Sequence, residues 1–265
     1  MTRDWQDAQP YHRSGSGETL VLIHGFTSSW HLWKPMIEIL EKDFDVIALS
    51  APGHLGWPWP EGLEVSIDNA VDLVERRLAE LGVEDAYVVG NSLGGAIALW
   101  MASRGTARVA VGLAPALGWI PGSLPVDRLF KASRQAVLDA RPQAEEILAS
   151  AELRQQILSV FMNHGDRVPV EEAVRTWDAV LAVDPMEEMV QVLYDFQLPS
   201  LGADTKAAIL WCGDDKTLPY DSCSQGWIDA APHATFRTIE GVGHSPMYDD
   251  PERVSAEIIE AIKNA

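Results

Sequence analysis

Ser92 stands at the centre of the segment GNSLGG, residues 90–95, which matches the pattern G-x-S-x-G. The segment follows a predicted strand and begins a predicted helix, and in this context the pattern forms a nucleophile elbow. Such a turn is tight, so Gly90 and Gly94 must lack side chains, and the serine backbone is held in a strained conformation. A glycine-rich turn with an incidental serine would show the same pattern. The context favours Ser92 as a nucleophile at a helix N-terminus.

A serine hydroxyl is a weak nucleophile and needs a base, which is normally an oriented histidine. His244 lies in the segment GVGHSP, residues 241–246, directly after the last predicted strand. We expect its loop to emerge at the same edge of the sheet as Ser92. His54 also follows a strand, but its loop comes early in the chain. We therefore predict that His244 is the base.

Two neighbouring aspartates follow another apolar strand, in the segment WCGDDK, residues 211–216. Asp214 and Asp215 could each orient the histidine, or both could belong to a solvated turn. Either aspartate lies between Ser92 and His244 in the chain. The order serine, acid, histidine occurs in one fold of serine hydrolases and differs from the orders of the two common serine protease folds. The residues alone leave both aspartates open.

A pair of backbone N–H groups is expected to stabilise the negative charge that forms on an attacked carbonyl oxygen. The segment HGFT, residues 24–27, ends the first clear strand. The glycine of this segment lets the N–H of Phe26 point inward, and the N–H of Leu93 supplies the second donor. His24 is expected to be a structural side chain beneath this loop rather than a base.

Short apolar runs alternate with amphipathic helical patterns, which predicts an α/β fold with a parallel sheet covered on both faces. The expected strands are residues 18–23, 44–49, 86–89, 109–113, 207–212 and 235–239. The expected helices around this sheet are residues 29–42, 66–81, 93–103, 219–230 and 251–263.

The alternation stops near Pro115, and the pattern up to Ser200 is entirely helical. We predict a core domain of residues 1–115 and 201–265, with a helical lid of residues 116–200 inserted into it. An insertion at the carboxyl end of a strand lies over the place where ligands bind in such sheets. The helices expected in the lid are residues 126–140, 144–162, 170–182 and 186–196.

A lid over such a site must present apolar side chains to an apolar substrate group. Most aromatic and methionine side chains of the lid are expected to form its own core and its contact with the sheet domain. Trp119, Met162 and Trp177 are the candidates that also line the substrate pocket.

The 265 residues include 39 acidic and 20 basic ones, and the formal charge is −19. This charge disfavours nucleic acid and membrane surfaces as partners. No apolar run reaches the ~18 residues of a membrane span, and the N-terminus lacks the apolar segment of a secretory signal. Cys212 and Cys223 do not suggest a disulfide framework or a zinc site. We expect a cytoplasmic protein with a small-molecule substrate.

The sequence resembles the lid-bearing serine hydrolases of the α/β-hydrolase superfamily. The motifs that carry the resemblance occur in the family's order, at residues 24–26, 52–54, 90–95, 213–215 and 243–244. It implies a mostly parallel, eight-stranded sheet with the lid after its sixth strand, and neither a metal nor an organic cofactor. In this family a proline that opens the next helix often follows the acid by a few residues. Asp215 and Pro219 fit that spacing better than Asp214 does.

The resemblance implies a hydrolase in which Ser92, Asp215 and His244 cleave a carboxylic ester through an acyl-enzyme intermediate. Members that use an aspartate nucleophile, the haloalkane dehalogenases and epoxide hydrolases, are excluded because the elbow carries serine. Hydrolysis of a lactone or a carbon–carbon bond, or perhydrolysis, would use the same residues. A ligand-binding receptor that has kept a vestigial triad is the alternative from another class.

Overall fold

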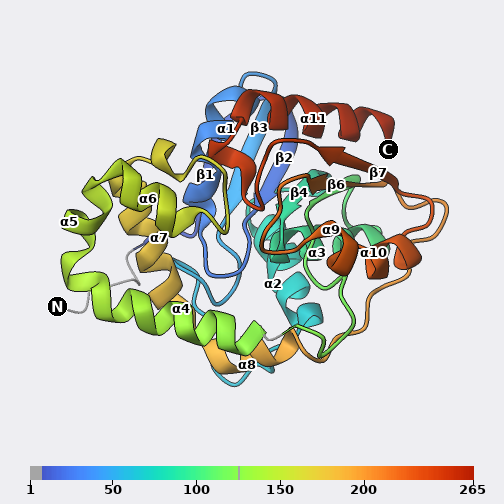
Figure 1. The fold of residues 1–265 in the computed structure, drawn as a ribbon. Coiled ribbons are helices and arrows are strands. Elements are labelled where there is room, and N and C mark those ends of the chain that lie inside the picture. The colour runs from blue at the N-terminus through green and yellow to red at the C-terminus, as the bar shows by residue number, and fades with distance from the viewer. Residues whose placement is uncertain (1–7, 125) are drawn as a thin grey trace.

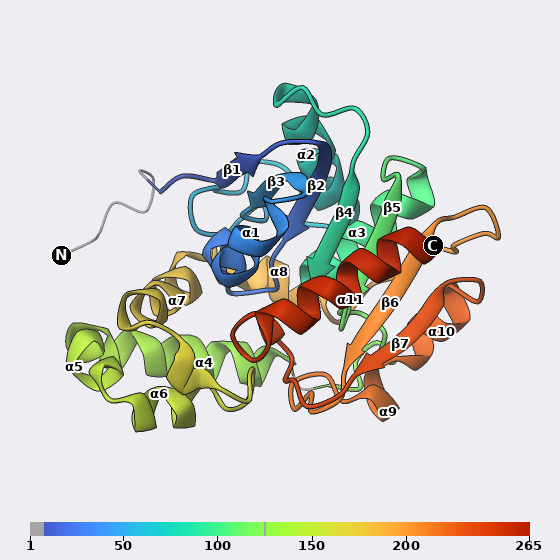
Figure 2. The ribbon, with the colours of Figure 1, turned by 90° about the horizontal axis from the view of Figure 1, so that it is seen from above.

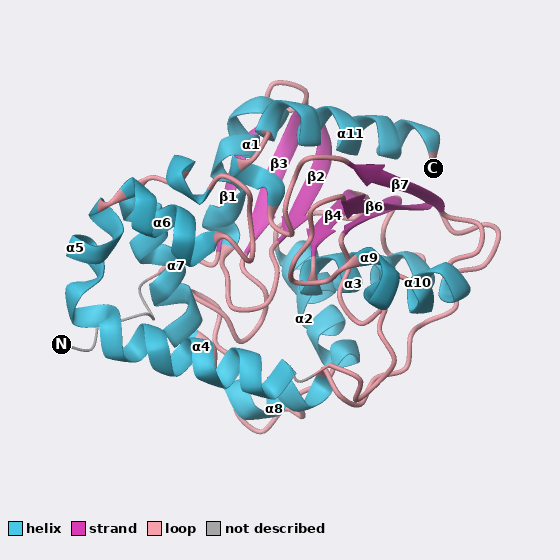
Figure 3. Ribbon diagram, viewed as in Figure 1, coloured by secondary structure: helices cyan, strands magenta, loops and turns pink. Residues whose placement is uncertain are grey.

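A sheet of seven strands forms the centre of the structure (Figures 1 and 3), a computed structural model that describes residues 8–124 and 126–265. The strand order is β1-β3-β2-β4-β5-β6-β7, and only β1 runs antiparallel to its neighbour. The strands are β1 (Tyr11–Gly15), β2 (Glu18–Ile23), β3 (Phe44–Leu49), β4 (Tyr87–Asn91), β5 (Val109–Leu113), β6 (Ala207–Cys212) and β7 (Thr235–Ile239).

Helices cover both faces of the sheet, which is why the inner strands are apolar on both sides. Every residue of β5 and β6 is buried. Figure 1 shows α1 and α11 together on one face and α2, α3 and α10 on the other. In Figure 2, α11 crosses the face of β4–β6. The bounds are α1 (Lys34–Leu40), α2 (Ile67–Glu80), α3 (Leu93–Arg104), α9 (Tyr220–Cys223), α10 (Gln225–Ala230) and α11 (Pro251–Asn264).

The segment between β5 and β6 is helical and lies to one side of the sheet, beyond the ends of its strands (Figures 1 and 2). We refer to residues 116–200 as the insertion. Within it, α7 packs against both α4 and α5. Its helices are α4 (Val126–Ala140), α5 (Ala144–Ala149), α6 (Ala151–Leu158), α7 (Val170–Ala182) and α8 (Met186–Val192).

The structure corrects the expected strand count. The described residues form seven strands rather than eight, so the insertion follows the fifth strand of the chain and not the sixth. The edge strand β1 pairs only with β3. Its sequence, YHRSG, is polar and half-exposed, which explains why no apolar run predicted it.

Three of the expected helices are divided. The helix predicted over residues 29–42 consists of a 3₁₀ helix, Trp30–Trp33, followed by α1. The helix predicted over residues 144–162 is interrupted at Ser150, whose backbone is extended. The side chain of Ser150 caps α6 by accepting a hydrogen bond from the N–H of Leu153. The helix predicted over residues 219–230 is divided into α9 and α10 at Ser224. Within residues 8–124 and 126–265, no helix is long and apolar enough to cross a bilayer.

Candidate active site

Ser92 occupies a strained turn between β4 and α3. Its backbone has φ 54° and ψ −117°, a conformation that a non-glycine residue adopts at a cost. A Cβ atom on Gly90 would lie 2.0 Å from the carbonyl oxygen of Gly94, and one on Gly94 would lie 2.2 Å from that of Ile23. Both glycines are therefore required for the turn, as the motif predicts.

Hydrogen bonds hold this turn against the neighbouring strand. The N–H of Ser92 donates to Leu113 O over 3.0 Å, and Ser92 O accepts from the N–H of Ala116 over 2.9 Å. The buried Asn91 side chain donates from Nδ2 to Leu113 O over 3.1 Å and to His244 O over 2.8 Å. Asn91 therefore ties the serine turn to the histidine loop. Sequence spacing gives no sign of this, since its partner His244 is 153 residues away.

His244 meets Asp215 rather than Asp214. The Nδ1 atom of His244 lies 2.7 Å from Oδ2 of Asp215, and both side chains are buried. The other oxygen of Asp215, Oδ1, accepts from the N–H groups of Thr217 (2.9 Å) and Leu218 (2.7 Å). The imidazole of His244 and two backbone N–H groups thus hold this carboxylate in place. Asp214 is exposed, and its Oδ2 accepts from the side-chain amide of Asn163 over 2.7 Å.

Asp249 joins the histidine loop to the insertion. Its buried carboxylate accepts from the N–H groups of Gly243 (2.8 Å), Asn163 (3.0 Å) and His164 (2.7 Å). The N–H of Ser245 also donates to Phe161 O over 2.7 Å. These bonds fix the segment that carries Met162 directly against the loop of His244.

The loop after β2 lies next to Ser92. A Cβ atom on Gly25 would lie 3.0 Å from the Cβ of Ser92, so any side chain here would press on Ser92. Phe26 follows it, and its ring meets those of His54 and Phe130 edge to face. Leu93 is the first residue of α3, where a backbone N–H has no partner within the helix.

His24 and His54 support this loop as neutral side chains. His24 is wholly buried, its Nδ1 lies 2.6 Å from Gly25 O, and its Nε2 accepts from the N–H of Ala51 over 2.8 Å. Burial first, and then the neighbouring His54, hold the pKa of His24 well below its usual value. Burial also lowers the pKa of His54 to about 4.

A cavity of about 90 Å³ opens at Ser92 and His244. Met162 lines it, together with other apolar side chains of the insertion. The described residues that line this cavity do not include Trp119 or Trp177, so the structure does not bring these two expected pocket residues to Ser92. The apolar part of the lining consists of Phe26, Leu32, Phe130, Leu158, Phe161, Met162 and Val180.

The two tryptophans are packing residues. Trp119 donates from Nε1 to Leu193 O over 3.3 Å and meets the ring of Phe196 edge to face. Trp177 is buried in the core, while its neighbour Thr176 faces the cavity. Successive residues of a helix point about 100° apart, which accounts for the different surroundings of these two side chains.

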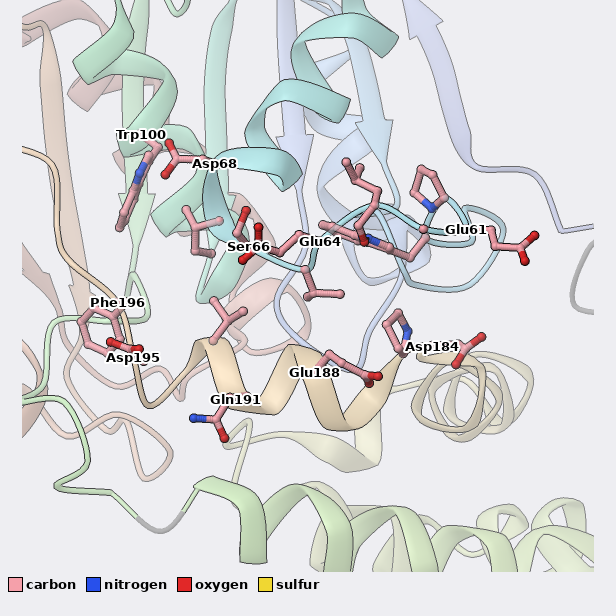
Figure 4. A pocket seen from close by; sticks show the side chains of 18 of the residues that line it. Glu61, Glu64, Ser66, Asp68, Trp100, Asp184, Glu188, Gln191, Asp195 and Phe196 are labelled. Atoms are coloured by element: carbon pink, nitrogen blue, oxygen red, sulfur yellow. The ribbon is translucent and has the colours of Figure 1, made fainter.

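A larger groove of about 970 Å³ runs between residues 59–68 and α8 (Figure 4). Its walls carry acidic side chains, with Glu61 and Glu64 on one side and Glu188 on the other. Its lining, as far as the chain is described, includes neither Ser92 nor His244. Within the same described ranges, no group of three or more His, Cys, Asp or Glu side chains could hold a metal ion.

Comparison with known proteins agrees with this architecture. An epoxide hydrolase, EphH of Mycobacterium tuberculosis, is 30% identical over 216 residues, which is 72% of this chain and 92% of the relative. An esterase structure from Thermogutta terrifontis superposes with a TM-score of 0.69 at 19% identity, over 96% of this chain and 92% of the other. A meta-cleavage product hydrolase structure from Pseudomonas fluorescens gives a TM-score of 0.67 at 21% identity, over 96% and 93%.

The sequence pattern of the alpha/beta hydrolase family matches residues 20–257, a span that contains the serine turn, the aspartate loop and the histidine loop. This match covers most of the chain. The protein therefore belongs to the alpha/beta hydrolase family.

Proposed function

We propose that this hydrolase cleaves carboxylic esters of small molecules through an acyl-enzyme intermediate. The observation that carries the proposal is the joint position of three side chains: Ser92 and His244 line one cavity, and Asp215 lies 2.7 Å from His244 on the side of Nδ1. In this geometry Nε2 of His244 is the nitrogen left for the serine proton.

In the proposed reaction, Ser92 Oγ attacks the ester carbonyl while His244 Nε2 takes the hydroxyl proton. The charge of Asp215 stabilises the imidazolium that forms and fixes its orientation. The N–H groups of Phe26 and Leu93 bind the oxyanion of the tetrahedral intermediate. His244 then gives the proton to the leaving alcohol, and a water molecule hydrolyses the acyl-serine by the same steps.

The serine turn favours this chemistry over epoxide opening, although a relative is named an epoxide hydrolase. Serine attack on a carbonyl generates an oxyanion at the N-terminus of α3, where the helix dipole and free N–H groups stabilise negative charge. The insertion, in this proposal, is a lid that forms the roof of the apolar cavity and selects the substrate. Met162 belongs to the insertion and lines the cavity, as the sequence predicts for it.

A panel of 4-nitrophenyl esters from acetate to octanoate, together with lactones, tests the proposal. We expect turnover of the esters with a burst of nitrophenol equal to the enzyme concentration, because acylation precedes hydrolysis of the acyl-enzyme. A fluorophosphonate probe should label the parent chain but not Ser92→Ala. Ser103→Ala removes a remote serine of α3 and is the control, which the probe should label like the parent. Tight ligand binding with almost no turnover would favour a receptor instead.

A further inference from the structure

A second, smaller cavity of about 20 Å³ lies beside the cavity at Ser92. The two cavities share Leu32, Leu158 and Met162, so these apolar side chains lie between them. Ser28 and Thr176 also line both cavities. A space of this size holds about one water molecule or one small polar group. We refer to the smaller cavity as the distal cavity.

Tyr248 gives the distal cavity a hydrogen-bond donor that the protein does not use. Its side chain is 9% exposed, and its hydroxyl has no hydrogen-bond partner among residues 8–124 and 126–265. The hydroxyl interacts electrostatically with Glu172 and Arg175, which also line this cavity. Burial, followed by the negative charge of Glu172, raises the pKa of Tyr248 above its usual value, so the hydroxyl keeps its proton. The oxygen of this hydroxyl is accessible, so it can donate to a group that binds in the cavity.

Arg175 offers a second donor at the same place. Its Nε donates to Glu172 over 3.3 Å, and its Nη2 donates to Glu171 over 2.8 Å. In the described part of the chain these bonds leave Nη1 available to a ligand. Lys34 also pairs with Glu172. The two cations, Lys34 and Arg175, are thus balanced by two carboxylates.

The remaining titratable side chain of the distal cavity is neutral. Burial lowers the pKa of His31 to about 3, and the nearby charges of Arg175 and Lys34 add to this effect. Its Nδ1 lies 3.2 Å from Ser29 Oγ. The distal cavity therefore combines two free donors with no net charge, a setting that suits an uncharged acceptor better than a carboxylate.

We propose that the distal cavity is a substrate subsite in which Tyr248 Oη and Arg175 Nη1 bind an uncharged oxygen at the far end of the substrate. An ether, carbonyl or hydroxyl oxygen would reach it after its carbon chain has passed Leu32, Leu158 and Met162. The inference rests on the proposed ester hydrolysis and names its substrate class: esters in which one chain is apolar near the ester bond and ends in a polar, uncharged group.

Matched pairs of esters test this subsite. In each pair one chain ends in an alkyl group and the other replaces one terminal methylene by an ether oxygen, for example heptanoate and 5-methoxypentanoate. The oxygen is placed in the acyl chain of 4-nitrophenyl esters in one series and in the alcohol chain of butyrate esters in the other. The kcat/KM of each pair is measured for the parent, for Tyr248→Phe and for the control Tyr220→Phe, whose side chain is exposed on α9.

We expect the parent to prefer the ether ester in one of the two series. Tyr248→Phe should reduce that preference about threefold to tenfold, the effect of one hydrogen bond, while Tyr220→Phe retains it. Turnover of the alkyl esters should be unchanged in Tyr220→Phe, because Tyr220 lines neither cavity. A preference that is absent from the parent, or equal in the parent and Tyr248→Phe, would overturn the subsite but not ester hydrolysis. A folded parent that hydrolyses no ester would overturn both.

Discussion

The Nδ1 atom of His244 lies 2.7 Å from Oδ2 of Asp215, although a second aspartate, Asp214, precedes Asp215 directly in the chain. Asp215 is 7% exposed and points into the site, whereas Asp214 is exposed and binds the amide of Asn163. The two neighbouring carboxylates thus have different surroundings, and this difference predicts which of them supports catalysis.

Exchange of each aspartate for asparagine separates the two roles. Asp215→Asn keeps the shape of the side chain but removes the charge that stabilises the imidazolium, and we expect kcat for a 4-nitrophenyl ester to fall about 10⁴-fold. Asp214→Asn is the matched control and should change kcat only slightly. Equal effects of the two exchanges, or a larger effect of Asp214→Asn, would contradict the assignment.

Asn91 is expected to matter for both stability and activity. Asn91→Ala removes the amide donor of the buried His244 O, whereas Leu113 O keeps the N–H of Ser92, and an unpaired buried group costs about 1–3 kcal/mol. We expect a lower free energy of unfolding in urea and a lower kcat, because the histidine loop loses its tie to the serine turn.

The control for Asn91 is Asn69→Ala, which removes an exposed amide that donates to Glu64 O. It should leave kcat unchanged. An Asn91→Ala enzyme with the kcat of the parent would show that the tie does not position His244.

Met162 is expected to influence chain-length preference. Met162→Ala enlarges the cavity at Ser92, so the kcat/KM for the octanoate ester should rise relative to that for acetate. Met186→Ala is the matched control, since Met186 is a buried methionine of the insertion outside that cavity. Both exchanges should destabilise the fold by about 2–5 kcal/mol. A similar ester profile in both variants would remove Met162 from the specificity site.

Acid should destabilise the protein partly through His54. Its pKa is about 4 in the folded chain and near 6.5 in an unfolded one. The unfolded state therefore binds more protons between these values, and stability is lost as the pH falls from about 6.5 to 4. His54→Phe keeps a buried ring but cannot titrate. The free energy of unfolding of this variant, measured in urea at pH 7.5, 6 and 5, should fall less with decreasing pH than that of the parent. Parallel pH dependences of the two proteins would contradict this.

Much of the fold follows from local patterns. Strands β2, β3, β5, β6 and β7 and helices α4 and α7 begin and end at the residues that their patterns predict. In each of them the apolar run or helical period ends where a polar turn begins. Ser66 caps α2 by accepting from the N–H of Asn69, and Gly82 follows the helix with φ 75°.

The remaining features depend on contacts that are distant in sequence. The partners of Asn91 and Asp249 come from other elements, and no spacing rule relates them. The sequence predicts Trp119 and Trp177 as pocket residues because large apolar side chains suit both a core and a cavity. Helical periodicity shows which face of α7 is apolar, but it does not show that Thr176 faces the cavity while Trp177 packs inside.

The most direct measurement is the mass of the protein during turnover. A reaction with 4-nitrophenyl butyrate is stopped with acid within the burst, and the intact chain and its peptides are weighed. We predict one butyryl group, located on Ser92, and none on Ser92→Ala, whose kcat should fall about 10⁶-fold while it remains folded. A butyryl group on another residue, or a Ser92→Ala variant that keeps most of the activity, would contradict the account.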